Sequence, residues 1–333
     1  MKRIVFMFSG QGAQYYQMGR ELFDADPVFR RWMHICDALA RPVIGANLTE
    51  IIYGNTLAES AGFDRLLHTH PALLAQGYSL AQALKCRGIE PDYVLGYSLG
   101  ELIGAVLAGA ISLQDGFALV LEQARLVECT TPPARMVAVL SRPELMQEQP
   151  KLFAGCTLSA VNFDRHFVVT MEESRFENLT QGLTRQHVTW AALPVRYGFH
   201  SGLLDPLEAP LRQFVSTIEL RRSTVPMVPS DRAEERRRLD GDQLWRMVRA
   251  PIRFGRSVDY LYTKADCVYL DLGPSGTLAS FVRQILGPGV ETYPALNAYG
   301  QDSRTVKRIT DSLILLGPQG KPDHAERSTP DAR

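Results

Sequence analysis

A Gly-x-Ser-x-Gly pentapeptide at residues 96–100, with the sequence GYSLG, constrains the fold of this chain more than any other feature. A short apolar run at residues 93–95 precedes it, and a stretch rich in Ala, Leu and Gly follows at residues 100–110. This context predicts a strand, a sharp turn and a buried helix, with Ser98 in a strained backbone conformation at the turn. Ser98 is therefore a candidate nucleophile, although the same pentapeptide can also form a glycine-rich turn whose serine has no catalytic role.

The segments around this turn predict an α/β domain with a parallel sheet. Residues 4–8 form a β-branched and aromatic run, and residues 71–86 have helical spacing, so that strands and helices alternate through residue 130. Further on, the pattern predicts a helix at 203–214, a strand at 267–272 and a last helix at 305–315. We expect a large α/β-hydrolase-like domain made of residues 1–130 and 195–316.

Residues 131–194 predict a second unit, inserted into that domain. Its helices are expected at 143–153 and 173–186, between strands at 136–140, 157–161, 167–171 and 188–193. This β-α-β-β-α-β order is that of the ferredoxin-like unit. The polar residues 317–333 predict a disordered tail.

The charge balance and the cysteines exclude several classes of protein. Lys+Arg and Asp+Glu number 36 each, so the chain has no basic excess of the kind that nucleic-acid binders show. The five cysteines form no CxxC pair, which argues against a zinc site or a disulfide framework. The apolar run at the N-terminus is too short for a signal peptide or a membrane span. We expect a cytoplasmic protein that needs no metal and binds neither nucleic acid nor membrane.

A nucleophilic serine needs a base, and the histidines alone do not identify it. His200 follows the inserted unit, where the chain re-enters the main domain, and His70 precedes a predicted helix. The residues themselves leave both open.

Five motifs, in order, carry a resemblance that covers residues 4–315. They are FSGQGAQ at 8–14 followed by MGREL at 18–22, GYSLGE at 96–101, GFHS at 198–201, PIRF at 251–254 and DLGP at 271–274. Together they resemble the malonyl-CoA:acyl-carrier-protein transacylase family, which includes the acyltransferases of polyketide synthases. The inserted unit also falls where this family has a ferredoxin-like subdomain.

The resemblance implies a role for each matched residue. Ser98 would carry the acyl group, His200 would be its base, and the backbone N–H groups of Gln11 and Leu99 would form the oxyanion hole. A main-chain carbonyl, expected from Arg253, would orient the histidine. The implied reaction is ping-pong acyl transfer through an acyl-Ser98 ester. The acyl group arrives on the phosphopantetheine of an acyl carrier protein or on CoA, and no further cofactor is expected.

The substrate-binding residues are where this chain departs from the family. Members that transfer malonyl groups have an arginine on the helix after the elbow helix, and the matching position here is Gln123. Arg125 lies two residues on, about 200° around a helix, although a shift of two residues in the alignment would restore it. Tyr97 replaces a histidine and His70 a glutamine, whereas the resemblance also places Asn162 and Phe199 in the cleft.

A neutral amide at position 123 favours an uncharged acyl group. In the family that this chain resembles, the arginine is missing from free-standing acyl hydrolases and from enzymes that load neutral starter units. The resemblance thus implies an editing enzyme that hydrolyses neutral acyl groups from acyl carrier proteins of polyketide biosynthesis. The alternative is a trans-acting acyltransferase that loads acetyl, another neutral starter or malonyl. A catalytically dead binding module or a lipase-type esterase fits the motifs less well, because Ser98 and His200 are both present and no acid residue is evident between them.

A basic cluster on this chain is a candidate docking site for an acidic helix of the carrier protein. The cluster comprises Arg232, Arg236, Arg237, Arg238, Arg246 and Arg249. Acidic residues are interleaved with it at Glu234, Glu235 and Asp240, so an ordinary solvated surface explains it at least as well.

Overall fold

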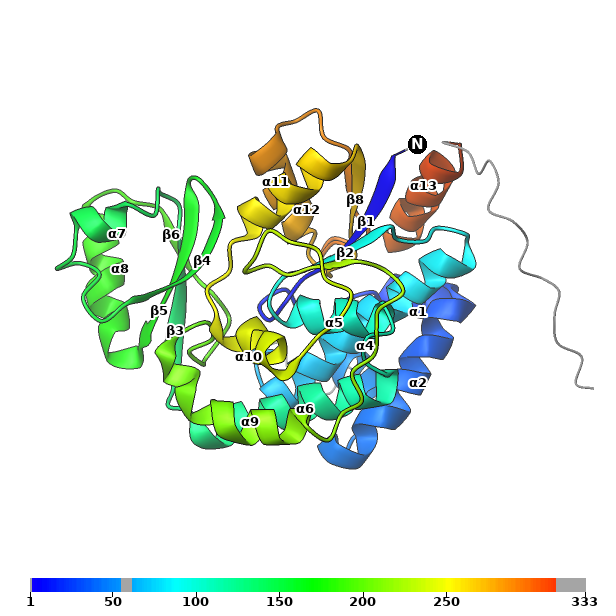
Figure 1. Ribbon diagram of the computed structural model, residues 1–333, viewed down its shortest axis with the longest axis horizontal. Coiled ribbons are helices and arrows are strands. Elements are labelled where there is room, and N and C mark those ends of the chain that lie inside the picture. Colours follow the sequence, from blue (N-terminus) through cyan, green and yellow to red (C-terminus); the bar gives the residue numbers. More distant parts are fainter. Residues whose placement is uncertain (1, 55–61, 316–333) are drawn as a thin grey trace, which may run out of the picture.

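The computed structural model describes residues 2–54 and 62–315, which fold around two sheets (Figure 1). The first sheet is parallel, with the strand order β7-β2-β1-β8-β9. Its strands are β1 (Arg3–Phe8), β2 (Tyr93–Gly96), β7 (Met227–Val228), β8 (Cys267–Asp271) and β9 (Thr292–Pro294). The central strands are continuous apolar runs because helices cover both of their faces. The predicted tail at 317–333 lies outside the described residues.

The register of this sheet brings three of the sequence motifs to one edge. Phe8 at the end of β1 lies opposite Gly96 at the end of β2, and Met7 lies opposite Asp271 at the end of β8. The turns that follow these three parallel strands are therefore neighbours at the carboxyl edge, where α/β sheets place their binding sites.

Helices enclose the parallel sheet. α5 packs on β1 and β2, α12 packs on β8, and α4 is surrounded by α2, α5 and α6. Figure 1 shows α11 and α12 on one side of the sheet, and α2, α4 and α6 on the other. The helices are α1 (Arg20–Ala25), α2 (Pro27–Ile44), α3 (Leu48–Tyr53), α4 (Leu66–Cys86), α5 (Leu99–Leu107), α6 (Leu113–Thr130), α9 (Glu208–Val215), α10 (Gly241–Arg249), α11 (Phe254–Lys264), α12 (Thr277–Leu286) and α13 (Asp302–Leu315), with a 3-10 turn η2 (Gly202–Leu207) before α9. Of the helices in the described ranges, none combines the length and apolar character needed to cross a bilayer.

The second sheet is antiparallel, with the order β4-β5-β3-β6. It comprises β3 (Ala134–Val139), β4 (Thr157–Phe163), β5 (His166–Glu172) and β6 (Trp190–Ala192), with the helices α7 (Leu145–Glu148) and α8 (Phe176–Arg185) and the 3-10 turn η1 (Glu173–Arg175). Both the element order and the strand order are those of the ferredoxin-like unit, so the predicted fold class is confirmed. The domain boundaries at residues 131 and 194 stay a prediction.

The second sheet is joined to the rest of the chain beside the carboxyl edge of the first. Ala160 of β4 forms an isolated parallel bridge with Ile252, the N–H of Ile252 donates to the carbonyl of Ser159, and the N–H of Val161 donates to the carbonyl of Ile252. These bonds fix the segment between α10 and α11 against β4. The candidate site lies at this junction.

Candidate active site

Ser98 lies at the turn between β2 and α5. Its backbone angles are φ 56° and ψ −123°, a conformation that costs a residue with a side chain on the order of 1–3 kcal/mol. Glycines allow the turn: a Cβ on Gly96 would lie 2.2 Å from the backbone of Glu101, and one on Gly100 would lie 1.8 Å from the carbonyl oxygen of Phe8. The strained turn predicted from the pentapeptide is therefore present, with Ser98 at its apex.

His200 is the histidine that contacts this serine. The Oγ of Ser98 lies 2.8 Å from Nε2 of His200, and on the far side of the ring Nδ1 lies 2.7 Å from the carbonyl oxygen of Ala250. A carbonyl oxygen only accepts hydrogen bonds, so Nδ1 carries the proton and the lone pair of Nε2 faces the serine hydroxyl. Of the two histidines that the sequence leaves open, the structure places His200 and not His70 against Ser98.

The prediction that Arg253 supplies the orienting carbonyl is wrong. Arg253 is the N-cap of α11, and its carbonyl accepts the N–H groups of Arg256 and Ser257 in the first turn of that helix. Ala250 instead follows the last residue of α10 and precedes Pro251, with φ −73° and ψ 145°. A residue before proline is held in this extended conformation, which leaves its carbonyl outside the helix and free for the imidazole.

Burial sets the charge of the His200 ring. It lowers the pKa of His200 to about 4, and the carbonyl of Ala250 and the charge of Asp231 offset only part of this effect. The ring is therefore neutral near pH 7. A neutral imidazole with its lone pair on the serine is the form that a general base requires.

The expected oxyanion hole lies beside the elbow. The loop after β1 packs on the turn so closely that a Cβ on Gly10 would lie 3.0 Å from Cβ of Ser98 and 3.3 Å from the nitrogen of Leu99. In the described part of the chain, the N–H groups of Gln11 and Leu99 donate no hydrogen bond. Leu99 also begins α5, where the helix dipole is positive. Two free donors beside a nucleophile suit a developing oxyanion, although their role stays a prediction.

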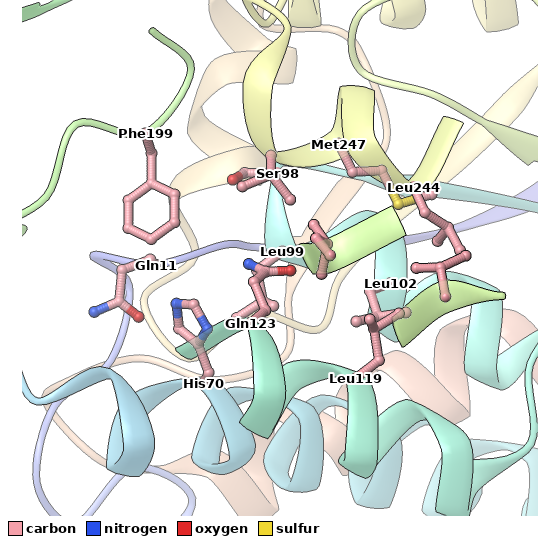
Figure 2. Close-up of a pocket in the computed structure, with 13 residues that line it drawn as sticks. Gln11, His70, Ser98, Leu99, Leu102, Leu119, Gln123, Phe199, Leu244 and Met247 are labelled. Atoms are coloured by element: carbon pink, nitrogen blue, oxygen red, sulfur yellow. The ribbon is translucent and has the colours of Figure 1, made fainter. Parts of the chain in front are cut away.

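Two cavities meet at Ser98. The first is lined by Gln11, His70, Gln123 and Phe199 together with leucine, valine and methionine side chains of α5, α6, α9 and α10 (Figure 2). The second lies where the two sheets meet and is lined by Tyr97, His200 and apolar side chains of β3, β4 and β5. Such concave, largely apolar spaces beside a nucleophile are typical of substrate sites.

Gln123 lines the first cavity, and Arg125 does not. The side chain of Gln123 on α6 is buried, with 7% of its surface exposed. The guanidinium of Arg125 lies at the surface and pairs with Glu122 at 2.6 Å. Within the described residues, neither cavity is lined by a lysine or an arginine. The site therefore presents an amide and no cation to the acyl group.

Four of the five predicted substrate-binding residues line a cavity, and Asn162 is the exception. It lies behind Tyr97, whose hydroxyl donates to its Oδ1 at 2.9 Å, and its Nδ2 lies 3.0 Å from Nδ1 of His166. Asn162 therefore acts on the site through Tyr97 and ties the elbow to β4. Phe199 lines both cavities, and its ring centroid lies 5.8 Å from that of His70.

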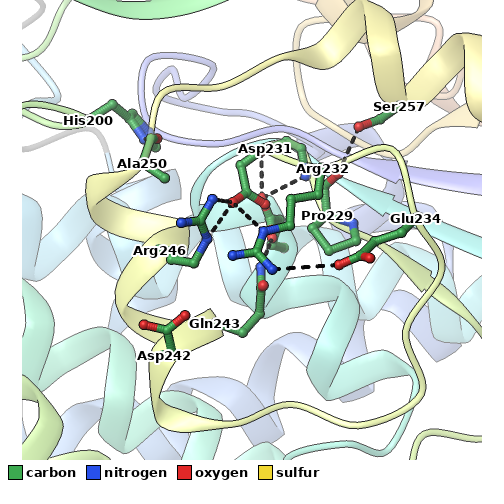
Figure 3. Close-up of polar contacts among 12 residues, drawn as sticks. His200, Pro229, Asp231, Arg232, Glu234, Asp242, Gln243, Arg246, Ala250 and Ser257 are labelled. Atoms are coloured by element: carbon green, nitrogen blue, oxygen red, sulfur yellow. Dashed lines mark hydrogen bonds and ion pairs between the residues drawn. The ribbon is translucent and has the colours of Figure 1, made fainter.

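A buried polar network joins α5 to α10, and sequence reasoning missed it. The carboxylate of Glu101 accepts the N–H of Ser230 at 2.9 Å and Nε2 of Gln243 at 3.4 Å, and burial raises the pKa of Glu101 to about 7. Next to it, Asp231 pairs with Arg246 of α10 (Figure 3). The sequence feature that could have indicated this network is Glu101, which directly follows the elbow pentapeptide. Its partners, however, lie about 130 residues away in the sequence.

The basic cluster considered for carrier docking is neutralised in part within the chain. Four of its six arginines form ion pairs: Arg232 and Arg246 with Asp231, Arg236 with Glu234, and Arg249 with Asp205. Figure 3 shows Arg232 and Arg246 converging on the Asp231 carboxylate. Because Arg232 and Arg246 share Asp231, three carboxylates offset part of the positive charge of the six arginines.

Comparison with known proteins agrees with this geometry. The profile of the acyl transferase domain family matches residues 5–313. The chain belongs to the acyl transferase domain family. The acyltransferase fold, predicted from the motifs, is thus confirmed, and the chain is an enzyme that acts through an acylated serine.

Two relatives of this acyl transferase domain come from bacilli. The chain is 40% identical over 286 residues to the polyketide biosynthesis acyltransferase homologue PksD of Bacillus subtilis, and the aligned region covers 86% of this chain and 88% of PksD. It is 39% identical over 322 residues to the polyketide biosynthesis acyltransferase homologue BaeD of Bacillus velezensis, and the aligned region covers 96% of this chain and 98% of BaeD.

Solved acyltransferase structures have the same fold. A loading acyltransferase from the avermectin modular polyketide synthase superposes with a TM-score of 0.83 at 27% identity, over 94% of this chain and 99% of that one. MCAT from Streptococcus pneumoniae superposes with a TM-score of 0.78 at 26% identity, over 93% and 100%.

Proposed function

We propose that this acyl transferase domain hydrolyses neutral acyl groups from acyl carrier proteins of polyketide biosynthesis. The observation that carries the proposal is Gln123, which lines the cavity of Ser98 where a carboxylate-binding cation would be needed. A malonyl carboxylate buried there would lose its hydration without an ion-pair partner, at a cost of several kcal/mol. An uncharged acyl chain meets only an amide and apolar walls. The names of the relatives PksD and BaeD support the setting in polyketide biosynthesis.

The proposed reaction has two halves that use the same groups. Oγ of Ser98 attacks the thioester carbonyl while Nε2 of His200 takes the hydroxyl proton, and the N–H groups of Gln11 and Leu99 stabilise the oxyanion. The carbon–sulfur bond then breaks, and the carrier thiol leaves with the proton from His200. In the second half, His200 takes a proton from water, the resulting hydroxide attacks the acyl-Ser98 ester, and the free acid leaves as Ser98 regains its proton.

A second candidate function is transfer of the acyl group to another carrier. The similarity to a loading acyltransferase at 27% identity favours it. The first half-reaction is the same, and the second uses a carrier thiol in place of water. In this case, the acyl-Ser98 ester must be stable until that thiol arrives.

Intact-protein mass spectrometry on a panel of acyl carriers tests the proposal. Carriers loaded with acetyl, propionyl, butyryl and malonyl are each incubated with the enzyme, and the acyl-enzyme and the free acid are followed in time. We expect neutral acyl groups to appear on Ser98 and to be released as free acid at a steady rate, and Ser98→Ala to show neither. A stable acyl-enzyme that discharges only onto a second carrier would establish the transferase instead. Efficient malonyl transfer would rule out the proposal that the enzyme prefers neutral acyl groups.

A further inference from the structure

One side of the first cavity holds polar groups that have nothing to bond. The amide nitrogen and oxygen of Gln11 and both ring nitrogens of His70 are buried and lack a hydrogen-bond partner among the described residues. Figure 2 shows Gln11, His70 and Gln123 together on one side of the cavity, with Leu102, Leu119 and Leu244 on the other. Because buried polar groups are almost always paired, several unpaired groups around one cavity indicate a ligand that bonds to them.

The proposed reaction does not use these side chains. The oxyanion takes the backbone N–H of Gln11 and leaves its amide side chain free, and the base is His200. His70 is 1% exposed. Burial lowers the pKa of His70 to about 4, and the backbone of Val120 offsets this effect only in part. The His70 ring is therefore neutral, with one donor and one acceptor, and it is no replacement for a carboxylate-binding cation.

The chemistry of these groups restricts the acyl chain that fits. Water can pair with them while the cavity is empty, but a bound chain displaces that water. A plain saturated chain would then leave the imidazole of His70 and the amide of Gln11 buried without partners. Sites that are built to bond a hydroxyl reject analogues without one for this reason. A hydroxyl both donates and accepts, as the neutral imidazole and the amides do.

Resting on the proposed function, we propose that the preferred substrate is a hydroxyacyl thioester, with its hydroxyl on one of the first carbons after the thioester carbonyl and an apolar remainder. Gln11, His70 and Gln123 bond the hydroxyl. The remainder of the chain lies against the leucine side chains of α5, α6 and α10.

The rate of Ser98 acylation tests this proposal without depending on the fate of the acyl-enzyme. Butyryl, 2-hydroxybutyryl and 3-hydroxybutyryl groups are offered as N-acetylcysteamine thioesters, so that carrier docking does not enter, and acyl-enzyme formation is followed by mass spectrometry. We expect the second-order rate constant for one hydroxylated group to exceed that for butyryl roughly tenfold or more.

Variants at position 70 show whether this selectivity comes from the polar groups. His70→Leu should lower the preference to about one by slowing the hydroxylated substrate more than butyryl, and a thermal unfolding transition like that of the wild type would show that the variant is folded. His70→Gln, which keeps a donor and an acceptor, should restore part of the preference. Leu244→Ala on the opposite wall should change both substrates alike.

The outcomes separate this inference from the proposed function. Equal acylation by butyryl and both hydroxybutyryl groups in the wild-type enzyme would overturn the hydroxyacyl proposal, and so would a preference that His70→Leu leaves intact. Selective acylation followed by discharge only onto a carrier would leave the hydroxyacyl proposal standing and refute hydrolysis.

Discussion

At the scale of single residues, the site depends on the neutral state of His200. Burial lowers the pKa of His200 to about 4, whereas an exposed histidine titrates near 6.5. In the proposed reaction the neutral form of His200 is the general base, so the acylation rate should fall only as the pH drops through about 4. At pH 5.5 an ordinary histidine would be about 10% neutral, but His200 should remain almost fully active.

A pH profile of kcat/KM checks this expectation. We expect a plateau from about pH 5.5 upward and an acid limb well below pH 6, measured with a neutral acyl thioester whose own charge does not change. His200→Ala should lower acylation on the order of 10³-fold or more across the plateau, because an unactivated serine is a poor nucleophile. An acid limb near pH 6.5 would show that the ring is not held in its buried, neutral form during the reaction.

Gln123 carries the second prediction at this scale. Gln123→Arg should shift the preference toward malonyl thioesters by roughly ten- to a hundredfold in kcat/KM, because a guanidinium supplies the bidentate partner that a buried carboxylate needs. The matched control is Arg125→Gln, which removes a surface arginine paired with Glu122 and should leave the malonyl-to-acetyl ratio unchanged. The opposite result, with the control altering selectivity and Gln123→Arg having no effect, would assign the clamp position to residue 125.

At the scale of elements, the end of α10 holds His200 in place. Its end supplies the carbonyls of Val248 and Ala250 that bond the backbone and ring of His200. The helix itself is anchored by Arg246, which pairs with the buried Asp231. A shift of α10 would therefore move the imidazole relative to Ser98.

Arg246→Met should weaken this anchor. We expect the free energy of unfolding to fall by about 1–3 kcal/mol, because Asp231 loses a buried partner, and kcat to fall roughly tenfold as Ala250 loses its fixed position. Arg249→Met is the control on the same helix, since its partner Asp205 is more than half exposed and its loss should cost less than about 1 kcal/mol. Denaturant unfolding and steady-state kinetics measure both effects. If both variants behaved alike, α10 would not be held by the Asp231 pair.

Elements with a strong local pattern were predicted from the sequence, and the others were not. The elbow, β1 and β8 have apolar runs that end in glycine turns, so their place could be predicted. Helix α10 was missed although its buried residues form the apolar face of an amphipathic helix, because Arg246 and Arg249 were considered only as members of the basic cluster. The helix expected at 143–153 is shorter, with α7 restricted to Leu145–Glu148.

At the scale of the whole molecule, the order of strands and helices predicted the two sheets, but not how they meet. Nothing in the local sequence indicates that Ala160 pairs with Ile252, because this pairing joins segments about 90 residues apart. The same limit applies to the site. Ser98 and His200 were chosen from motifs, whereas Ala250 and the Glu101 network depend on long-range contacts that a single sequence does not contain.

The carbonyl oxygen of Ala250, which bonds the ring of His200, is a part of the site that mutagenesis of its own side chain does not reveal. The carbonyl of Ala250 belongs to the backbone, so replacing the Ala250 side chain leaves the oxygen in place. A scan of side-chain substitutions would therefore detect Ser98 and His200 but would not detect position 250 itself. Pro251 is the nearest side chain whose replacement reaches this oxygen, because it holds the preceding peptide extended. In the proposed reaction, Pro251 thus contributes to the orientation of His200 through the carbonyl of the residue that precedes it.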